Sequence, residues 1–341
     1  MKMVKILGLL ILHCQWVHAT VLWAGSEDMD FPVGASISMD TGTYRAGYQR
    51  ATMLVASNSS AYSNPFPGGS VTSVWVSAQI VICCGTGERV FGLAKSGTSG
   101  SLVIGVDSNN PNKLGLYTFD GNNQTEIASE TGNSISGNTM FKVDMQVINY
   151  GASATVNVYT KGSSTPAITY TGNVAVGGAT SLDQVVLFGY NNWVRQSEII
   201  VANTDTRGLS LVTLSPNAAG DTNQWTNTYT NVASVSINDA INVYDNTSGD
   251  LFEAKFNSLP SGSFSIPAVI VATRSAQSGT GGLTSLSVGV KTNGSVSSPA
   301  AVSLLPAFNL VSTLYSTNPV TTSAWTVSDI NALQICLKSA P

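Results

Sequence analysis

The chain has 341 residues, enough for about two domains, and 10% of them are charged while 43% are hydrophobic. Ser, Thr and Asn supply most other polar side chains, which is typical of β-sheets with uncharged outer faces and unlike helical bundles, coiled coils or charged disordered tails. The formal net charge is −4, and two of the basic residues, Lys2 and Lys5, stand in an apolar N-terminal stretch. Because the rest of the chain therefore has an even larger excess of acidic groups, we expect neither nucleic-acid nor membrane binding.

Both histidines, His13 and His18, also lie in that N-terminal stretch. The rest of the chain therefore lacks the imidazole that Ser-His-Asp and Cys-His hydrolases, histidine-ligated zinc and histidine-ligated haem require. The composition favours a binding or structural protein over an enzyme.

Residues 1–20 form an apolar leader. Lys2 and Lys5 flank the start of the run ILGLLIL, and Val17, His18 and Ala19 loosely match a cleavage site with small residues. The run is too short to span a bilayer. The segment is a secretory signal, an N-terminal arm that packs on a neighbour, or the product of a start codon placed too far upstream.

The four cysteines do not form a disulfide framework. Cys14 is in the leader, Cys336 is near the C-terminus, and Cys83 and Cys84 are adjacent in a strand-like run. Because neighbouring strand residues point to opposite faces, we expect one of that pair to be an inert core thiol rather than half of a bridge between them.

Apolar and polar residues alternate along much of the chain. Residues 73–82 and 141–147 each place every second, apolar side chain on one face, which predicts antiparallel strands with one buried face. Similar alternation predicts strands at 155–159, 251–256, 285–291 and 333–338.

Turn residues separate these segments. Asp120-Gly121 and Asn293-Gly294 are hairpin sequences. One short helix is predicted over residues 326–332, with Thr326 as its cap and Asp329 three residues later near the positive helix end.

Many short strands with polar turns predict an all-β fold of two tandem antiparallel β-sandwich or jelly-roll domains. A run of turn residues between 203 and 220 marks the boundary. The predicted domains are residues 21–207 and 208–341, which follow the leader.

The sequence lacks the closely spaced carboxylates of retaining glycan hydrolases, whose two carboxyl groups must lie about 5 Å apart. Glu27, Asp28 and Asp30 are the nearest approach, and we expect them to form a solvated turn or cap. We therefore predict no catalytic residues and no cofactor.

Asp107, Asn109 and Asp120 carry oxygen ligands of the kind that calcium prefers, and they would form a site if their two loops converge. Asp and Asn are equally typical of β-turns, and no EF-hand spacing supports a metal, so turns are the favoured interpretation.

Asn191, Asn192 and Trp193 follow an apolar strand at residues 185–188. An aromatic ring beside amide groups can hold a sugar, although a single Trp more often covers the edge of a core. Arg207 is expected to pair with Asp205 or with backbone carbonyls rather than with an acidic sugar. Trp225 and Trp325 are expected to anchor a core or an interface.

Several longer segments carry a resemblance to a known family. VLWAGSEDMDFP (21–32), TYRAGYQRATMLV (43–55) and DQVVLFGYNNWVRQSEIIVANTDTRG (183–208) resemble the laminin-G-like, concanavalin-A-like jelly roll of tailed-bacteriophage virion proteins. LSLVTLSPNAAGDTNQWT (209–226) and NPVTTSAWTVSDINALQICLKSA (318–340) resemble a second β-domain that often accompanies it.

The resemblance implies a non-enzymatic structural protein of a phage virion, assembled in the host cytoplasm and associated with the tail or its fibres. It also implies homo-oligomeric contacts, contacts with other virion structural proteins, and adhesion to host cell-surface polysaccharide. A head-associated capsid decoration protein is one alternative. A secreted lectin or glycan hydrolase is another, if the leader is a signal peptide.

Overall fold

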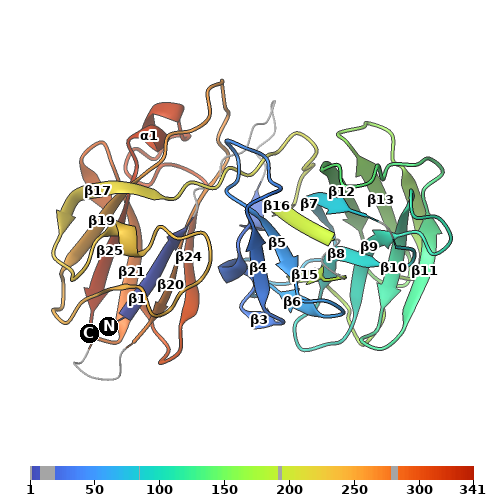
Figure 1. The fold of residues 1–341 in the computed structure, drawn as a ribbon, viewed down its shortest axis with the longest axis horizontal. Helices are drawn as coiled ribbons and strands as arrows, with labels where there is room; N and C mark the ends of the chain where they lie inside the picture. Colours follow the sequence, from blue (N-terminus) through green and yellow to red (C-terminus); the bar gives the residue numbers. More distant parts are fainter. Residues whose placement is uncertain (1, 8–19, 84, 191–193, 278–282) are drawn as a thin grey trace. The chain divides into compact units, whose positions relative to one another are not determined.

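The computed structural model describes residues 2–7, 20–83, 85–190, 194–277 and 283–341. Figure 1 shows that their regular elements are nearly all strands, joined by loops. Within these residues the chain forms two compact units. The jelly-roll unit contains residues 20–44 and 51–209, and the C-terminal unit contains residues 2–7, 45–50 and 210–341.

The jelly-roll unit is built from two antiparallel sheets. The first, called the β7 sheet, has the order β14-β13-β12-β7-β16-β5-β4, and β2 also pairs with β16. Its strands are β2 (Val21–Gly25), β4 (Ile37–Asp40), β5 (Thr52–Val55), β7 (Val74–Ile82), β12 (Phe141–Ile148), β13 (Ala154–Thr160), β14 (Ile168–Gly172) and β16 (Val194–Ala202).

The second, called the β9 sheet, has the order β11-β10-β9-β8-β15-β6-β3. Its strands are β3 (Val33–Gly34), β6 (Ser60–Tyr62), β8 (Arg89–Ala94), β9 (Ser101–Val106), β10 (Leu114–Phe119), β11 (Gln124–Ser129) and β15 (Gln184–Phe188). The core of the unit takes residues from both sheets, such as Val76 and Val143 from one and Leu93 and Leu116 from the other.

The C-terminal unit also has two antiparallel sheets. One has the order β18-β1-β20-β24, and the other has the order β17-β19-β25-β21-β22 with β23 paired to β21. The strands are β1 (Lys2–Leu7), β17 (Pro216–Asn223), β18 (Val243–Tyr244), β19 (Leu251–Phe256), β20 (Val269–Ala276), β21 (Ser285–Thr292), β22 (Ser295–Ser297), β23 (Val302–Ser303), β24 (Asn309–Tyr315) and β25 (Gln334–Ala340).

These sheets confirm the predicted all-β class, and every strand predicted from alternation is present. Two segments of the C-terminal unit come from distant parts of the sequence. Residues 2–7 of the leader form β1, which pairs with β18 and β20. Residues 45–50, which lie inside the predicted first domain, belong to this unit, where the Tyr48 carbonyl accepts a hydrogen bond from Thr213 N (2.8 Å).

The predicted turn and helix chemistry is confirmed. Asn293 and Gly294 form the two-residue loop between β21 and β22, with φ values of 50° and 76° that suit a type I′ turn. Helix α1 (Val327–Asn331) begins after Thr326, whose hydroxyl accepts a hydrogen bond from Asp329 N (3.1 Å). The Asp329 carboxylate accepts from Thr326 N in return (2.9 Å), which completes a capping box.

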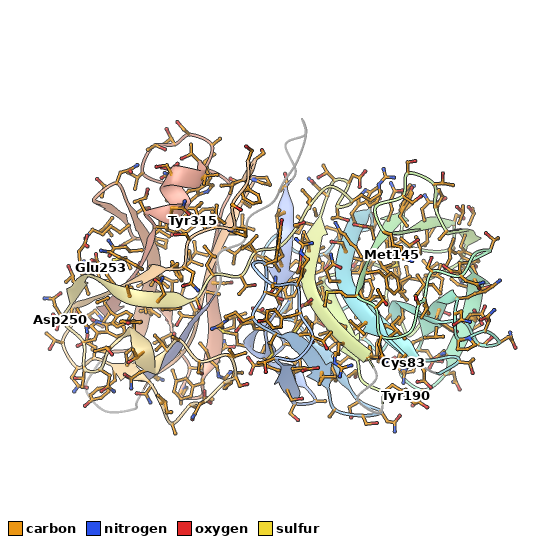
Figure 2. All side chains as sticks on the ribbon, turned by 45° about the horizontal axis from the view of Figure 1, so that its top comes forward. Cys83, Met145, Tyr190, Asp250, Glu253 and Tyr315 are labelled. Atoms are coloured by element: carbon orange, nitrogen blue, oxygen red, sulfur yellow. The ribbon has the colours of Figure 1, made fainter. Side chains whose placement is uncertain are left out.

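Trp225 and Trp325 are buried in the core of the C-terminal unit, as predicted. Their indole N–H groups donate to the carbonyls of Asp250 (3.1 Å) and Tyr315 (3.2 Å), two residues labelled in Figure 2. Both indoles are therefore buried with their polar atom satisfied.

Cys83, which follows β7, is buried and disulfide-bonded. Cys84 lies outside the described residues, so the prediction that one of these two cysteines is an inert core thiol stays a prediction. Among the described residues, Cys336 is the free cysteine, and burial raises its pKa to about 11. No helix in the described residues is both long enough and apolar enough to cross a membrane.

The prediction that β7 has one buried and one exposed face is wrong, since every residue of β7 is buried. The cover on the outer face is residues 203–209, here called the strap. Lys142 Nζ donates to the carbonyls of Thr206 (2.5 Å) and Leu209 (2.6 Å), and the Thr206 hydroxyl donates to Asp144 Oδ1 (2.7 Å). Alternation therefore describes which residues share a face but not what covers it.

Arg207 completes the strap. Its guanidinium donates to both oxygens of Asp205 (2.6–3.0 Å) and to the Ser163 carbonyl (3.2 Å), which confirms the predicted pairing. It also lies 4.4 Å from the ring centroid of Tyr159, which stacks on Trp75 with 5.5 Å between centroids.

The strap can be tested by replacing Thr206 with Val. Thr206 and Asp144 are both fully buried, so T206V leaves a buried carboxylate short of a donor and should lower the free energy of unfolding by about 1–3 kcal/mol. The measurement is the urea midpoint followed by Trp fluorescence, with T125V at an exposed position of β11 as the control. Equal midpoints for the two variants would show that the strap bond contributes nothing.

Candidate ligand-binding face

The outer face of the β9 sheet carries large apolar side chains. Along β10, Leu116 points into the core while Tyr117 and Phe119 join a second apolar cluster, and along β15 the same alternation separates Leu187 from Phe188. We call this second cluster, together with Arg89, the aromatic face. Its members are Tyr62, Arg89, Ala94, Val103, Tyr117, Phe119, Val186 and Phe188.

Arg89 lies in the corner formed by two aromatic rings of this face. Its guanidinium carbon is 4.0 Å from the Phe119 centroid and 4.5 Å from the Phe188 centroid. The two rings meet edge to face, with centroids 5.9 Å apart and planes at 88°. Burial lowers the pKa of Arg89, while Tyr62 and Glu88 act in the opposite direction. An arginine nevertheless stays charged at neutral pH, so the face presents a cation framed by rings.

Tyr117 forms the floor beneath the exposed residues. Gly105 and Gly115 are directly opposite one another on β9 and β10, and a Cβ at Gly115 would lie 2.7 Å from the Tyr117 ring. The Tyr117 hydroxyl donates to the Val106 carbonyl. Burial, followed by the charges of Glu126, Asp107 and Glu88, raises its pKa. Tyr117 is therefore a fixed, neutral side chain.

Glu88 and Tyr190, here called the rim, are joined by a side-chain hydrogen bond. The charge of Glu88 acts on Arg89 and Tyr117 of the aromatic face, whereas Tyr190 packs against the core between the two sheets. Burial raises the pKa of Glu88 despite the hydrogen bond. A Cβ at Gly85 would lie 3.2 Å from the Tyr190 ring, so the turn before β8 reaches this residue, which Figure 2 labels in the jelly-roll unit.

Asn191, Asn192 and Trp193, the predicted sugar-binding residues, lie outside the described residues. They directly follow the rim residue Tyr190 in the sequence. Their prediction as a binding loop remains a prediction.

The predicted calcium ligands are not brought together. Asp107 follows β9 and Asp120 follows β10, and because Val106 pairs with Leu114 while Ser101 pairs with Phe119, the two carboxylates lie at opposite ends of β10. Each is used in its own turn, where Asp107 Oδ1 accepts from Asn109 N (2.8 Å) and Asp120 Oδ1 accepts from Asn122 N (2.9 Å). The two loops therefore do not converge, and these hydrogen bonds agree with the favoured interpretation of both segments as turns.

The acidic cluster at the end of β2 is a cap, as predicted, but it is not solvated. Glu27, Asp28 and Asp30 are all buried around the short 3₁₀ helix η1 (Asp28–Asp30). Asp30 Oδ2 accepts hydrogen bonds from the backbone N–H groups of Ser26 (2.8 Å) and Glu27 (2.9 Å). Burial outweighs these bonds and raises the pKa of Asp30 to about 7.

The Asp30 carboxyl should make stability depend on pH. Because its pKa is about 7 when folded and 3.8 in the reference state, the folded chain holds a proton that the unfolded chain has lost. Stability from this group therefore falls as pH rises from about 4 to about 7, by up to about 4 kcal/mol. D30N keeps an oxygen acceptor and removes the titration.

The urea midpoints of D30N and the parent protein at pH 5 and pH 8 test this effect. From pH 5 to pH 8 the parent should lose the stability that the Asp30 proton provides, whereas D30N has no such proton to lose. The urea midpoint of D30N should therefore rise relative to that of the parent. D120N is the control, since the pKa of the exposed Asp120 is lowered by its turn and the group is ionised throughout this range. An unchanged difference between D30N and the parent would contradict the raised pKa.

A second prediction concerns the floor of the aromatic face. G115A should displace the Tyr117 ring and lower the free energy of unfolding by about 1–3 kcal/mol, because a tightly packed site must accept an extra methyl group. Gly132 has open space around its Cβ position, so G132A should leave the urea midpoint nearly unchanged. Equal effects of both variants would show that Tyr117 is not held as described.

Sequence analysis missed Tyr62, Arg89, Phe119 and Phe188 as a group. The available indication was that runs such as VVLF (185–188) are apolar at every position rather than at alternate ones. Only the register of four strands shows that the outward residues of those runs meet on one surface.

Comparisons with known proteins give similarity in structure only. No family model matches the chain, and no curated protein matches it. Among solved structures, the CBM2 module of the evolved Dit of Lactobacillus casei BL23 phage J-1 is 13% identical, with 59% of this chain and 99% of that chain covered and a TM-score of 0.33.

Two further solved structures are similar. Domains LG4-5 of the mouse laminin α1 chain are 12% identical, with coverages of 89% of this chain and 76% of that chain and a TM-score of 0.32. The metal-free lectin I-B4 from Griffonia simplicifolia is 11% identical, with coverages of 48% and 92% and a TM-score of 0.28. At these values the function has to be argued from the residues themselves.

Proposed function

We propose that this chain is a non-enzymatic structural protein of a phage virion, placed in the tail or its fibres, and that its aromatic face binds host cell-surface polysaccharide. The observation that carries the binding proposal is the partly exposed set of Tyr62, Arg89 and Phe119 over a rigid floor. Antiparallel sheets usually keep polar side chains on a face that is not packed against a core. An apolar face of this kind is typical of a surface that meets a ligand.

Carbohydrate is the ligand class that suits these groups. Pyranose rings have apolar C–H faces that pack on aromatic rings, and hydroxyl groups that need hydrogen-bond partners. Phe119 and Tyr62 offer ring surface, while the Arg89 guanidinium and the Glu88–Tyr190 rim offer polar atoms. The aromatic rings and the Arg89 guanidinium thus lie on the same outer face of the β9 sheet.

The virion part of the proposal is supported by the sequence segments that resemble tailed-phage proteins. A disulfide on Cys83 also fits a protein that ends in an oxidising environment, such as the surface of a virus particle or the outside of a cell. Virion proteins repeat by symmetry, so homo-oligomers and contacts with other structural proteins form part of the same proposal.

Removal of an aromatic ring tests the binding site. F119A should weaken binding to an array of host-surface polysaccharides by about tenfold or more, because it removes ring surface and one of the two rings that contact Arg89. Y44A is the control, since Tyr44 is an exposed aromatic residue of the jelly-roll unit outside this face. Equal binding by F119A and Y44A would reject the aromatic face as the site.

The same samples test the absence of catalysis and the location of the protein. Release of new reducing ends from any bound polysaccharide would favour a glycan hydrolase instead, and the acids whose charges reach Tyr117 of the face are Glu126, Asp107 and Glu88. Mass spectrometry and antibody labelling of purified particles distinguish tail, head and secreted protein. Labelling at the head alone would favour the capsid decoration alternative.

A further inference from the structure

We propose that Arg89 makes the aromatic face selective for saccharides that carry a carboxylate, such as uronic acids, over neutral ones. This inference rests on the proposed glycan binding. Three features of Arg89 support it. The guanidinium contacts two aromatic rings, it has no hydrogen bond or ion pair within the described residues, and other arginines of the chain are ion-paired.

The Arg89 guanidinium lies against the faces of two aromatic rings. Its central carbon is 4.0 Å from the Phe119 centroid and 4.5 Å from the Phe188 centroid, and the two rings meet at 88° with centroids 5.9 Å apart. The guanidinium therefore sits in the corner that the rings form, and the rings do not cover its sides that face away from this corner. A planar guanidinium can donate two parallel hydrogen bonds to a carboxylate.

Within the described residues, the Arg89 guanidinium has no hydrogen bond and no ion pair. The adjacent Glu88 does not supply one, since its carboxyl is hydrogen-bonded to Tyr190. Arg89 is also half-buried, and the loss of hydration lowers its pKa despite the opposing charges of Tyr62 and Glu88. Such a cation gains more from an anionic ligand than a fully hydrated one does.

Other arginines of the chain show the contrast. Arg195, Arg207 and Arg274 are ion-paired with Asp40, Asp205 and Asp239 respectively. Arg207 and Arg274 each donate from two nitrogens to the two oxygens of the partner carboxylate. At Arg89 the corresponding acceptor is missing from the described residues, and a carboxylate from a ligand would fill that role.

The geometry of a uronic acid suits this site. Its carboxyl group is attached to the edge of the pyranose ring. A sugar that stacks on Phe119 or Tyr62 can therefore direct its carboxylate toward the Arg89 guanidinium. The chain is acidic overall, with a net charge of −4, so long-range attraction would not favour an anionic polymer. Selectivity would therefore arise from the local pair.

Methyl-esterified polysaccharides provide a matched test, because the ester removes the charge and keeps the sugar. Polygalacturonate, alginate and hyaluronan would each be compared with their methyl esters as ligands for the full chain. We expect at least one acidic form to bind tenfold or more tightly than its ester. R89Q should abolish that difference, and R89K, which keeps the charge without the planar fork, should retain part of it.

The outcomes separate this inference from the proposed function. F119A should weaken binding of acid and ester alike, because it removes ring surface used by both. Equal binding of acid and ester by the parent protein, or a preference unchanged in R89Q, would overturn carboxylate selectivity alone. Failure of every polysaccharide in both forms to bind would reject the glycan-binding proposal and this inference with it.

Two additional controls complete the design. Thermal unfolding of R89Q and R89K must match that of the parent, and R89M replaces R89Q if the latter is unfolded, since it retains packing between the rings. A phosphodiester-containing teichoic acid is included as a probe. Binding to it that depends on Arg89, without binding to any carboxylate form, would replace the carboxylate by a phosphate and overturn the proposal as stated.

Discussion

Neighbouring residues of a β-strand point to opposite faces of the sheet, and in the jelly-roll unit both faces of each sheet are used. The inner faces of the two sheets share one apolar core. The outer faces differ in chemistry, because one holds Lys142, Asp144 and Trp75 beneath the strap and the other holds the aromatic face. One outer face is thus covered by the strap, whereas the other carries the partly exposed side chains of Tyr62, Arg89 and Phe119.

The closed face depends on polar contacts. Asp144 is fully buried, burial raises its pKa, and its partners are the Lys142 ammonium (3.4 Å) and the Thr206 hydroxyl. Groups of this kind need their partners, since an unpaired buried charge is strongly destabilising. The strap thus acts as a structural element although it contains no strand. Arg89, on the other outer face, instead contacts the rings of Phe119 and Phe188.

Sequence reasoning succeeded where the determinants are local. The Asn293-Gly294 turn follows from positive φ angles, and the start of α1 follows from Thr326 and Asp329 within one turn of helix. It failed where the determinants are distant in sequence. Ser77 lies on a predicted polar face, but nothing in residues 73–82 indicates that residues 203–209 will cover that strand. Likewise, Asp107 and Asp120 are separated because the hairpin places six residues of β10 between them.

The candidate site shows the same limit. Tyr62, Arg89, Phe119 and Phe188 come from four strands, and their meeting depends on the order β10-β9-β8-β15-β6 within the sheet. No short motif contains more than one of them. Arg89 in particular looks like an ordinary solvated charge beside Glu88 until the Phe119 and Phe188 rings that contact it are placed.

The paired glycines under Tyr117 have an evolutionary consequence. Because Gly105 and Gly115 are opposite one another and leave room for a flat ring, the shape of the floor is set by the backbone and by one phenol. The outward side chains at positions 62, 89 and 119 can then diversify without disturbing the sandwich interior, since the inward residues of the same strands are separate from them. The part of the outer face that varies most easily is thus separate from the part that stabilises the unit.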